Sequence, residues 1–332
     1  MEIPVTRVST ILPYTRLLRS VGAPVDRLLN RARIPPELLN HPAAVVPLVN
    51  AFRFGELACQ TEETEHLGFL VGLSTTLEDY GPYGNILQNA LTVYDYLQKG
   101  ISLYNMVITG QRLRLSEHGE EFRLTIESDV EPGVGAYQSH METLITTIAR
   151  LKEAAGPEWS PRVVSLAYRA QEHLPDTDLL AGSRIIQGAG ETFLTIPRAI
   201  MGERFPDSDC MVDIDMAMSH ERSLPKDQAG VVKHQIESLS SDSPVRIDAV
   251  AESLAMNTRS LQRRLAKEEQ TYSRLYSDIR MKKAAEWLEN TDKPIAEIAS
   301  ELGYRDASNF TRAFIRQAGV SPRTYRNHSK HA

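Results

Sequence analysis

The sequence has very few cysteines and no long apolar run. Its 332 residues include two cysteines, Cys59 and Cys210, which lie far apart along the chain. Two distant thiols exclude a disulfide framework and a CxxC zinc site. No apolar run reaches the ~18 residues that a membrane-spanning helix needs, and the first residues lack the basic and apolar regions of a signal peptide. We therefore expect a cytoplasmic protein that does not associate with a membrane.

The motifs of common enzyme and metal sites are also missing. The sequence holds no GxSxG nucleophile elbow, no Walker A run, no HExxH and no paired Cys/His residues at metal-ligand spacing. The string Gly188-Ala189-Gly190 is not a nucleotide-binding fingerprint. We expect no catalytic residue, no metal and no cofactor.

The composition is that of a globular protein, with an uneven distribution of charge. Hydrophobic residues make up 42% of the chain and charged residues 24%, which is ordinary for a folded protein of about two domains. From Lys233 to the end there are 17 basic and 13 acidic residues, a balance of +4, whereas the remaining 20 basic and 30 acidic residues give −10. An acidic body with a basic C-terminal module suggests that the C-terminal end binds a polyanion.

The first 205 residues mix helical and strand periodicity. Apolar spacing predicts helices over 46–61, 84–98 and 136–154. Two alternating segments, 111–115 and 122–126, flank a turn that contains Gly119 and predict a β-hairpin with a five-residue loop. Further strands are expected over 163–168 and 191–196. This part of the chain is therefore predicted to be an α+β domain.

Two linker-like stretches follow the α+β part. Leu224-Pro225 and the segment 238–244 carry the Pro and Ser residues typical of connections. We accordingly divide the chain into a regulatory domain at 1–205, a partly helical linker at 206–232 and a C-terminal module at 233–332.

The C-terminal module contains the same helical pattern twice. The first copy places four apolar residues on one helical face: Ile247, Val250, Ala251 and Leu254. A second helix follows, with Asn257 as a candidate N-cap and Leu261 and Leu265 as its inner stripe. About 48 positions later the matching residues are Ile295, Ile298, Ala299, Leu302, Phe310 and Phe314. Two such units in register, joined by an amphipathic helix over 272–289, predict an all-α double helix-turn-helix.

These residues resemble the AraC/XylS family of transcriptional regulators. The most specific matches are Ile298-Ala299, Gly303-Tyr304, Ser308, Phe310, Arg312, Ala313-Phe314, Gly319, Ser321-Pro322 and Tyr325-Arg326. The resemblance covers about 100 residues and departs from the family at Glu269, where a glycine is usual after the first recognition helix. Without glycine, a left-handed helix end costs about 1 kcal/mol, or the helix ends differently.

The resemblance implies a sequence-specific DNA-binding regulator. Two recognition helices, about 34 Å apart, would read successive major grooves of double-stranded promoter DNA. By position in the family motif, the expected DNA contacts are Arg259, Gln262 and Arg263 in the first unit and Arg305, Ser308, Asn309, Thr311, Arg312 and Arg316 in the second. Arg offers a fork to guanine, and Gln and Asn match adenine. Arg305 and Arg316 are expected closer to the phosphates.

The N-terminal part more weakly resembles the effector domain of the ornithine-utilisation-regulator subgroup. Its helices, its hairpin and Trp159-Ser160-Pro161 before a strand carry this similarity. The candidate residues of an effector pocket are Tyr80, Tyr83, Tyr94, Tyr104 and His140. Before the resemblance is considered, the tyrosines fit better as an ordinary helix core with hydroxyls at the surface, and His140 is also compatible with a pH-sensitive or interface residue.

Two questions stay open at the level of sequence. The N-terminal domain either binds a small-molecule effector or is a constitutive surface for dimerisation or protein docking. Besides promoter DNA, the expected partners are a second copy of the chain, bound through the N-terminal domain, and RNA polymerase. The rival to a regulator is an enzyme with a DNA-binding tail, such as a cysteine alkyl-transfer protein. That enzyme would need an activated thiol, and neither Cys59 nor Cys210 has basic neighbours in the sequence.

Overall fold

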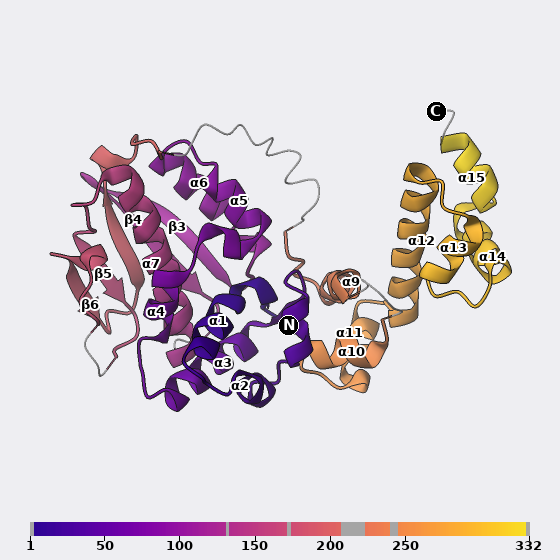
Figure 1. The fold of residues 1–332 in the computed structure, drawn as a ribbon, viewed down its shortest axis with the longest axis horizontal. Coiled ribbons are helices and arrows are strands. Elements are labelled where there is room, and N and C mark those ends of the chain that lie inside the picture. Colours follow the sequence, from indigo (N-terminus) through magenta and orange to yellow (C-terminus); the bar gives the residue numbers. More distant parts are fainter. Residues whose placement is uncertain (1–2, 131–132, 171–173, 207–222, 240–244, 330–332) are drawn as a thin grey trace. The chain divides into compact units, whose positions relative to one another are not determined.

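The computed structural model describes residues 3–130, 133–170, 174–206, 223–239 and 245–329. The chain divides into two compact units, Met1–Lys226 and Asp227–Ala332 (Figure 1). The first unit combines helices with sheets, and the described residues of the second unit form helices alone. The predicted fold class, an α+β domain followed by an all-α module, is confirmed.

A five-stranded sheet organises the N-terminal unit. Its strands are β3 (Gln111–His118), β4 (Glu121–Ser128), β5 (Val163–Leu166), β6 (Arg184–Gln187) and β7 (Thr192–Pro197). The strand order is β3-β4-β7-β5-β6, and the neighbours are antiparallel except for the parallel pair β5 and β6. A separate antiparallel pair joins β1 (Val5–Arg7) and β2 (Val45–Pro47). Strand β6 lacked a clear signal in the sequence.

The β3–β4 hairpin is tighter than the sequence suggests. His118 pairs with Glu121, so the connection has two residues, Gly119 and Glu120, and the predicted five-residue loop is wrong. Gly119 has a φ of +64°, which the first position of a type II′ turn requires and which glycine adopts without strain. The polar run that suggested a longer loop belongs to the exposed ends of the two strands.

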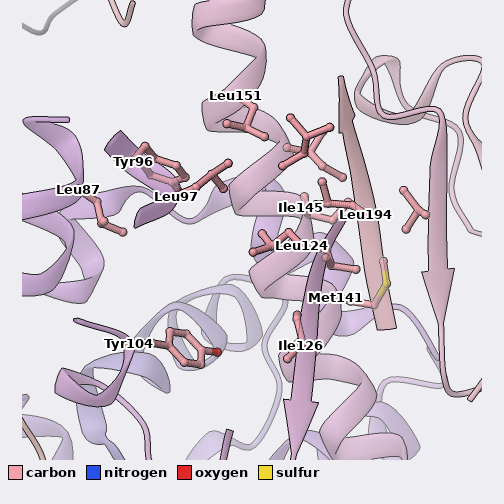
Figure 2. Packing of buried hydrophobic residues seen from close by; sticks show 14 of the residues in the cluster. Leu87, Tyr96, Leu97, Tyr104, Leu124, Ile126, Met141, Ile145, Leu151 and Leu194 are labelled. Carbon is pink, nitrogen blue, oxygen red and sulfur yellow. The ribbon is translucent and has the colours of Figure 1, made fainter. Parts of the chain in front are cut away.

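Helices cover the sheet. The helices of this unit are α1 (Leu12–Ser20), α2 (Val25–Arg31), α3 (Leu48–Thr61), α4 (Leu67–Ser74), α5 (Pro82–Gln88), α6 (Val93–Leu103) and α7 (Val134–Ala155). Helix α7 packs against α3, α4 and strand β7 (Figure 1). Figure 2 shows Met141 and Ile145 of α7 beside Leu124 and Ile126 of β4 and Leu194 of β7. This cluster is the core of the unit.

The helical run predicted over 84–98 is two helices. Thr92 has an extended backbone and its side chain accepts a hydrogen bond from Asp95 N at 3.2 Å, so a new helix begins at Val93. The break lets both α5 and α6 direct apolar side chains into the core, including Leu87 and Leu97. The N-cap therefore overrides the continuous apolar periodicity.

Glycines bring α4 very close to α7. A Cβ on Gly68 would lie 2.0 Å from Gln138 O, and one on Gly72 would lie 2.8 Å from Ile145 Cβ. The contact is fixed by Gln138, whose Oε1 accepts from Gly68 N at 2.6 Å and whose Nε2 donates to Glu65 O at 2.8 Å. The middle of α7, with residues 138–142, is held in place in this way.

The C-terminal unit contains the two predicted helix-turn-helix elements. Its helices are α9 (Gln228–Leu239), α10 (Ile247–Ser253), α11 (Thr258–Lys267), α12 (Tyr272–Asn290), α13 (Ile295–Glu301), α14 (Ala307–Ala318) and α15 (Pro322–Ser329). Asn257 is the N-cap of α11, as predicted, and accepts from Ser260 N at 2.8 Å. Asp306 caps α14 in the same way, with a distance of 2.7 Å to Asn309 N.

The two turns have the same backbone geometry. In the first, Ala255 has a φ of +53° and Met256 N donates to Ala251 O at 2.8 Å. In the second, Gly303 has a φ of +75° and Tyr304 N donates to Ala299 O at 2.9 Å. The repeat thus extends from the sequence pattern to the individual hydrogen bonds of the turn.

Helix α11 ends in a left-handed residue even without glycine. Glu269 has a φ of +55°, and Gln270 N closes the helix by donating to Leu265 O at 2.9 Å. We expect Glu269→Gly to raise the free energy of unfolding of the C-terminal unit by about 1 kcal/mol, because glycine adopts this backbone without steric cost. Urea unfolding followed by Trp287 fluorescence in a Trp159→Phe background measures this unit alone.

Glu269→Ala is the matched control for this prediction. It removes the same carboxylate but keeps the Cβ, so the steric cost stays and the gain should be absent. Equal unfolding free energies for the glycine and alanine variants would show that the left-handed backbone is not the source of the effect.

Candidate DNA interface and effector cavity

The first recognition helix, α11, presents a polar face opposite a buried apolar stripe. Leu261 and Leu265 are fully buried, whereas Arg259, Gln262 and Arg263 are all exposed. Helical periodicity separates these two sets onto opposite faces. The predicted contact residues of the first unit therefore lie together on one accessible surface.

The second recognition helix, α14, repeats this arrangement. Phe310 and Phe314 are buried, and the two aromatic rings lie 5.7 Å apart between centroids. The exposed residues of the predicted set are Arg305, Ser308, Arg312 and Arg316, while Asn309 and Thr311 are half-buried. Within the described part of the chain, none of the five exposed arginines of the two predicted sets forms an ion pair with a carboxylate: Arg259, Arg263, Arg305, Arg312 and Arg316.

A chain of hydrogen bonds orients Arg312. Asp306 Oδ2 accepts from Asn309 Nδ2 at 2.8 Å, and Asn309 Oδ1 accepts from Arg312 Nη2 at 2.6 Å. Both ends of the Asn309 amide are therefore used inside the helix. Asn309 is arranged to position Arg312, whose other guanidinium donors remain available for a base or a phosphate.

The N-terminal unit contains a cavity of about 590 Å³, including the space at its mouth. Its wall comes from α1, α3, α7 and three short 3-10 helices: η1 (Val8–Thr10), η3 (Leu77–Tyr80) and η4 (Tyr104–Met106). It includes the aromatic side chains Tyr14, Phe52, Phe54, Tyr80 and Tyr104. Two of the predicted pocket residues, Tyr80 and Tyr104, line it.

One acidic side chain, Glu142 on α7, lies at this cavity. It is 6% exposed, and one carboxylate oxygen accepts a hydrogen bond from the hydroxyl of Tyr80. Burial raises the pKa of Glu142 to about 7, although the hydrogen bond from Tyr80 acts in the opposite direction. Burial also raises the pKa of Tyr80 and Tyr14 well above the ordinary value, so both hydroxyls stay protonated at neutral pH.

A second cavity has a volume of about 450 Å³, including the space at its mouth. Tyr83 and Tyr96 line it together with Thr143 and Thr146 of α7. Tyr80 belongs to the walls of both cavities. Three of the four predicted tyrosines, at 80, 83 and 104, are thus brought to this region by helices α5 to α7 and the short helices beside them.

The other two predicted pocket residues lie elsewhere. Tyr94 is 50% exposed, because Val93, Tyr96 and Leu97 form the buried face of α6, and it lines neither cavity. His140 is buried on α7 but is also absent from both walls, and burial lowers its pKa to about 4. Sequence reasoning missed Glu142 and Tyr14, since an acidic residue in a long helix ordinarily faces solvent.

The cysteine chemistry required by an enzymatic alternative is not supported at Cys59. This residue is buried, and desolvation raises the pKa of its thiol to about 12. A thiol with such a pKa is almost entirely protonated at neutral pH and is a poor nucleophile. Cys210 lies outside the described residues.

The described residues show no cluster of three or more His, Cys, Asp or Glu side chains that would hold a metal ion. Nor does any helix in the same part of the chain combine the length and apolarity that crossing a membrane requires.

Comparisons with known proteins agree with both units. Residues 22–205 match the arabinose-binding domain of AraC transcription regulators, N-terminal part, and residues 250–328 match a helix-turn-helix domain. The transcriptional regulator VqsM of Pseudomonas aeruginosa is 31% identical over 274 residues, which cover 78% of this chain and 83% of VqsM.

Two further relatives extend this result. VirS of Mycobacterium tuberculosis, also a helix-turn-helix transcriptional regulator, is 26% identical over 346 residues and 96% of both chains. The ornithine utilization regulator of Pseudomonas aeruginosa is 39% identical over 80 residues, which cover 24% of each chain. The chain therefore belongs to the AraC family of transcription regulators, and its helix-turn-helix unit is that of a DNA-binding protein.

Proposed function

We propose that this regulator reads its operator with α11 and α14 and that the N-terminal unit controls DNA binding through a small-molecule effector. The observation that carries the proposal is the pair of matching exposed faces, one on each recognition helix, opposite buried stripes. Arg263 and Arg312 contact bases in successive major grooves, while Arg305 and Arg316 lie closer to phosphates. The effector occupies the cavity beside Glu142.

We assign residues 1–205 to regulation, 206–232 to the linker and 233–332 to DNA binding, with one refinement. The boundary between the compact units falls between Lys226 and Asp227. Helix α9 then belongs to the DNA-binding unit, where Glu268 accepts from Gln228 N at 3.0 Å and Ala229 N at 2.8 Å. This long-range N-cap ties α9 to the end of the first recognition helix.

The same proposal includes the partners of the regulator. A single subunit covers an asymmetric half-site, and a homodimer formed through the N-terminal unit covers two half-sites. RNA polymerase is a further partner where the operator adjoins a promoter. The protein acts in the cytoplasm, where the chromosomal DNA is, and is not an enzyme.

Genome-wide footprinting of the full-length protein tests the function. We expect discrete protected sites that share a motif with two blocks about 10–10.5 base pairs apart, which is one turn of the duplex. The variant that carries both Arg263→Ala and Arg312→Ala is the control and should lose these sites. Binding spread over the genome without a shared motif would contradict the proposal.

A further inference from the structure

The described residues that line the cavity beside α7 include one carboxyl side chain and no basic side chain. Among the described residues that line it, Glu142 is the one side chain that carries a charge near neutral pH, and none is Lys, Arg or His. Most other lining side chains are aliphatic or aromatic, including Phe52, Phe54 and Ile108. A ligand that enters this cavity therefore meets a mostly apolar wall with neutral polar groups and a single carboxyl group.

Two other polar side chains of the wall, Tyr14 and Gln138, already have partners inside the protein. The hydroxyl of Tyr14 donates to Gln138 O at 3.0 Å, and the Gln138 side chain is used in the contact between α4 and α7. Glu142 differs from both. Its Oε1 accepts from Tyr80, and the described residues supply no donor to its Oε2. This oxygen is the acceptor that a ligand can use.

A buried carboxylate without a cation is costly, and burial accordingly raises the pKa of Glu142 to about 7. A ligand that brings its own positive charge removes this cost, because an ion pair with a hydrogen bond is strong away from water. An anionic ligand meets no cation in the wall. Aromatic rings such as those of Tyr80 and Phe52 also favour a cation over an anion.

We propose that the effector is an organic amine, whose ammonium group pairs with Glu142 and whose apolar body packs against Phe52, Phe54 and Ile108. This proposal rests on the function proposed above, because it names the chemical class of the effector. Amino acids are excluded from this class, since their α-carboxylate would be buried without a cation. The ligand carries one ammonium group at one end and no anion.

Three probes of equal length test the proposal with the full-length protein. Hexylamine, 1-hexanol and hexanoate differ at one end of the molecule, as a cation, a neutral group and an anion. We expect isothermal titration to give a Kd for hexylamine at least ~10-fold lower than for either other probe, as for a charge-assisted hydrogen bond. Glu142→Gln should abolish this preference, and Glu120→Gln, exposed at the hairpin tip, should preserve it.

The wild-type comparison decides the ligand class even if Glu142→Gln does not fold. Equal or tighter binding of 1-hexanol or hexanoate would overturn the proposal, and so would the absence of hexylamine binding at about 10 mM. Unchanged hexylamine affinity in folded Glu142→Gln would also overturn it.

Operator binding, measured in the same samples, separates this proposal from the proposed function. If hexylamine binding depends on Glu142 and changes operator affinity, both proposals are supported. If that binding leaves operator affinity unchanged, the amine site stands but the cavity does not control DNA binding. If the wild type binds no DNA sequence specifically, either with or without hexylamine, the proposed function is contradicted.

Discussion

Replacing Arg263 or Arg312 by alanine is expected to weaken operator binding by about 1–3 kcal/mol each, or about 5- to 150-fold in Kd. Both side chains are exposed on the faces opposite the buried stripes of α11 and α14. A guanidinium that donates two hydrogen bonds to guanine loses both when truncated. Binding to random DNA should fall much less, since that binding depends mainly on the total charge at the phosphates.

Fluorescence anisotropy with the footprinted operator and a random duplex of the same length measures the two losses at one salt concentration. Arg27→Ala, which removes an exposed arginine of the N-terminal unit, is the matched control and should change neither. Asn309→Ala keeps the Arg312 guanidinium but removes its acceptor, so its effect should be smaller than that of Arg312→Ala. Equal losses on both duplexes would identify the arginines as phosphate contacts.

The helix-turn-helix pair is readable from the sequence because its determinants are local. A cap such as Asn257 acts on Ser260, three residues away, and the turn at Gly303 is closed between Ala299 and Tyr304. The same local pattern recurs about 48 positions later, so each copy supports the assignment of the other. The missing glycine at Glu269 left two outcomes open, a left-handed residue or a different helix end, and the structure shows the left-handed residue.

The cavity is harder to predict because its residues are far apart in sequence. Glu142 meets Tyr80 from 62 positions away, and Tyr14 reaches Gln138 across 124 positions. Helical periodicity tells which face of α7 is buried, but it does not tell whether a neighbouring helix leaves a space there. For the same reason Tyr94, in a run of tyrosines, could not be distinguished from Tyr96, which lines the second cavity.

Glu142 and His140 should give the N-terminal unit opposing pH dependences. The Glu142 pKa is raised from 4.5 to about 7, so its proton stabilises the fold below pH ~4.5, and this stability is lost as the pH rises through about 7. The His140 pKa is lowered from 6.5 to about 4, so its contribution is present above pH ~6.5 and is lost as the pH falls through about 4. In the wild type the two contributions offset each other over this range.

Glu142→Gln removes the Glu142 contribution, so the His140 contribution is no longer offset. The free energy of unfolding of the variant should therefore increase, relative to that of the wild type, as the pH rises. The difference between their free energies of unfolding should increase by about 3 kcal/mol from pH ~4.5 to ~7.5, which is the linkage value for the Glu142 shift. Tyr14, Tyr80 and Tyr104 around the carboxyl group do not titrate in this range, and Asp79 is paired with Arg16.

Urea unfolding of the ligand-free protein, followed by Trp159 fluorescence in a Trp287→Phe background, measures this unit. A difference that stays constant with pH would mean that Glu142 ionises as easily in the folded chain as in the unfolded one. The buried carboxylate would then carry no desolvation cost for an ammonium ligand to remove.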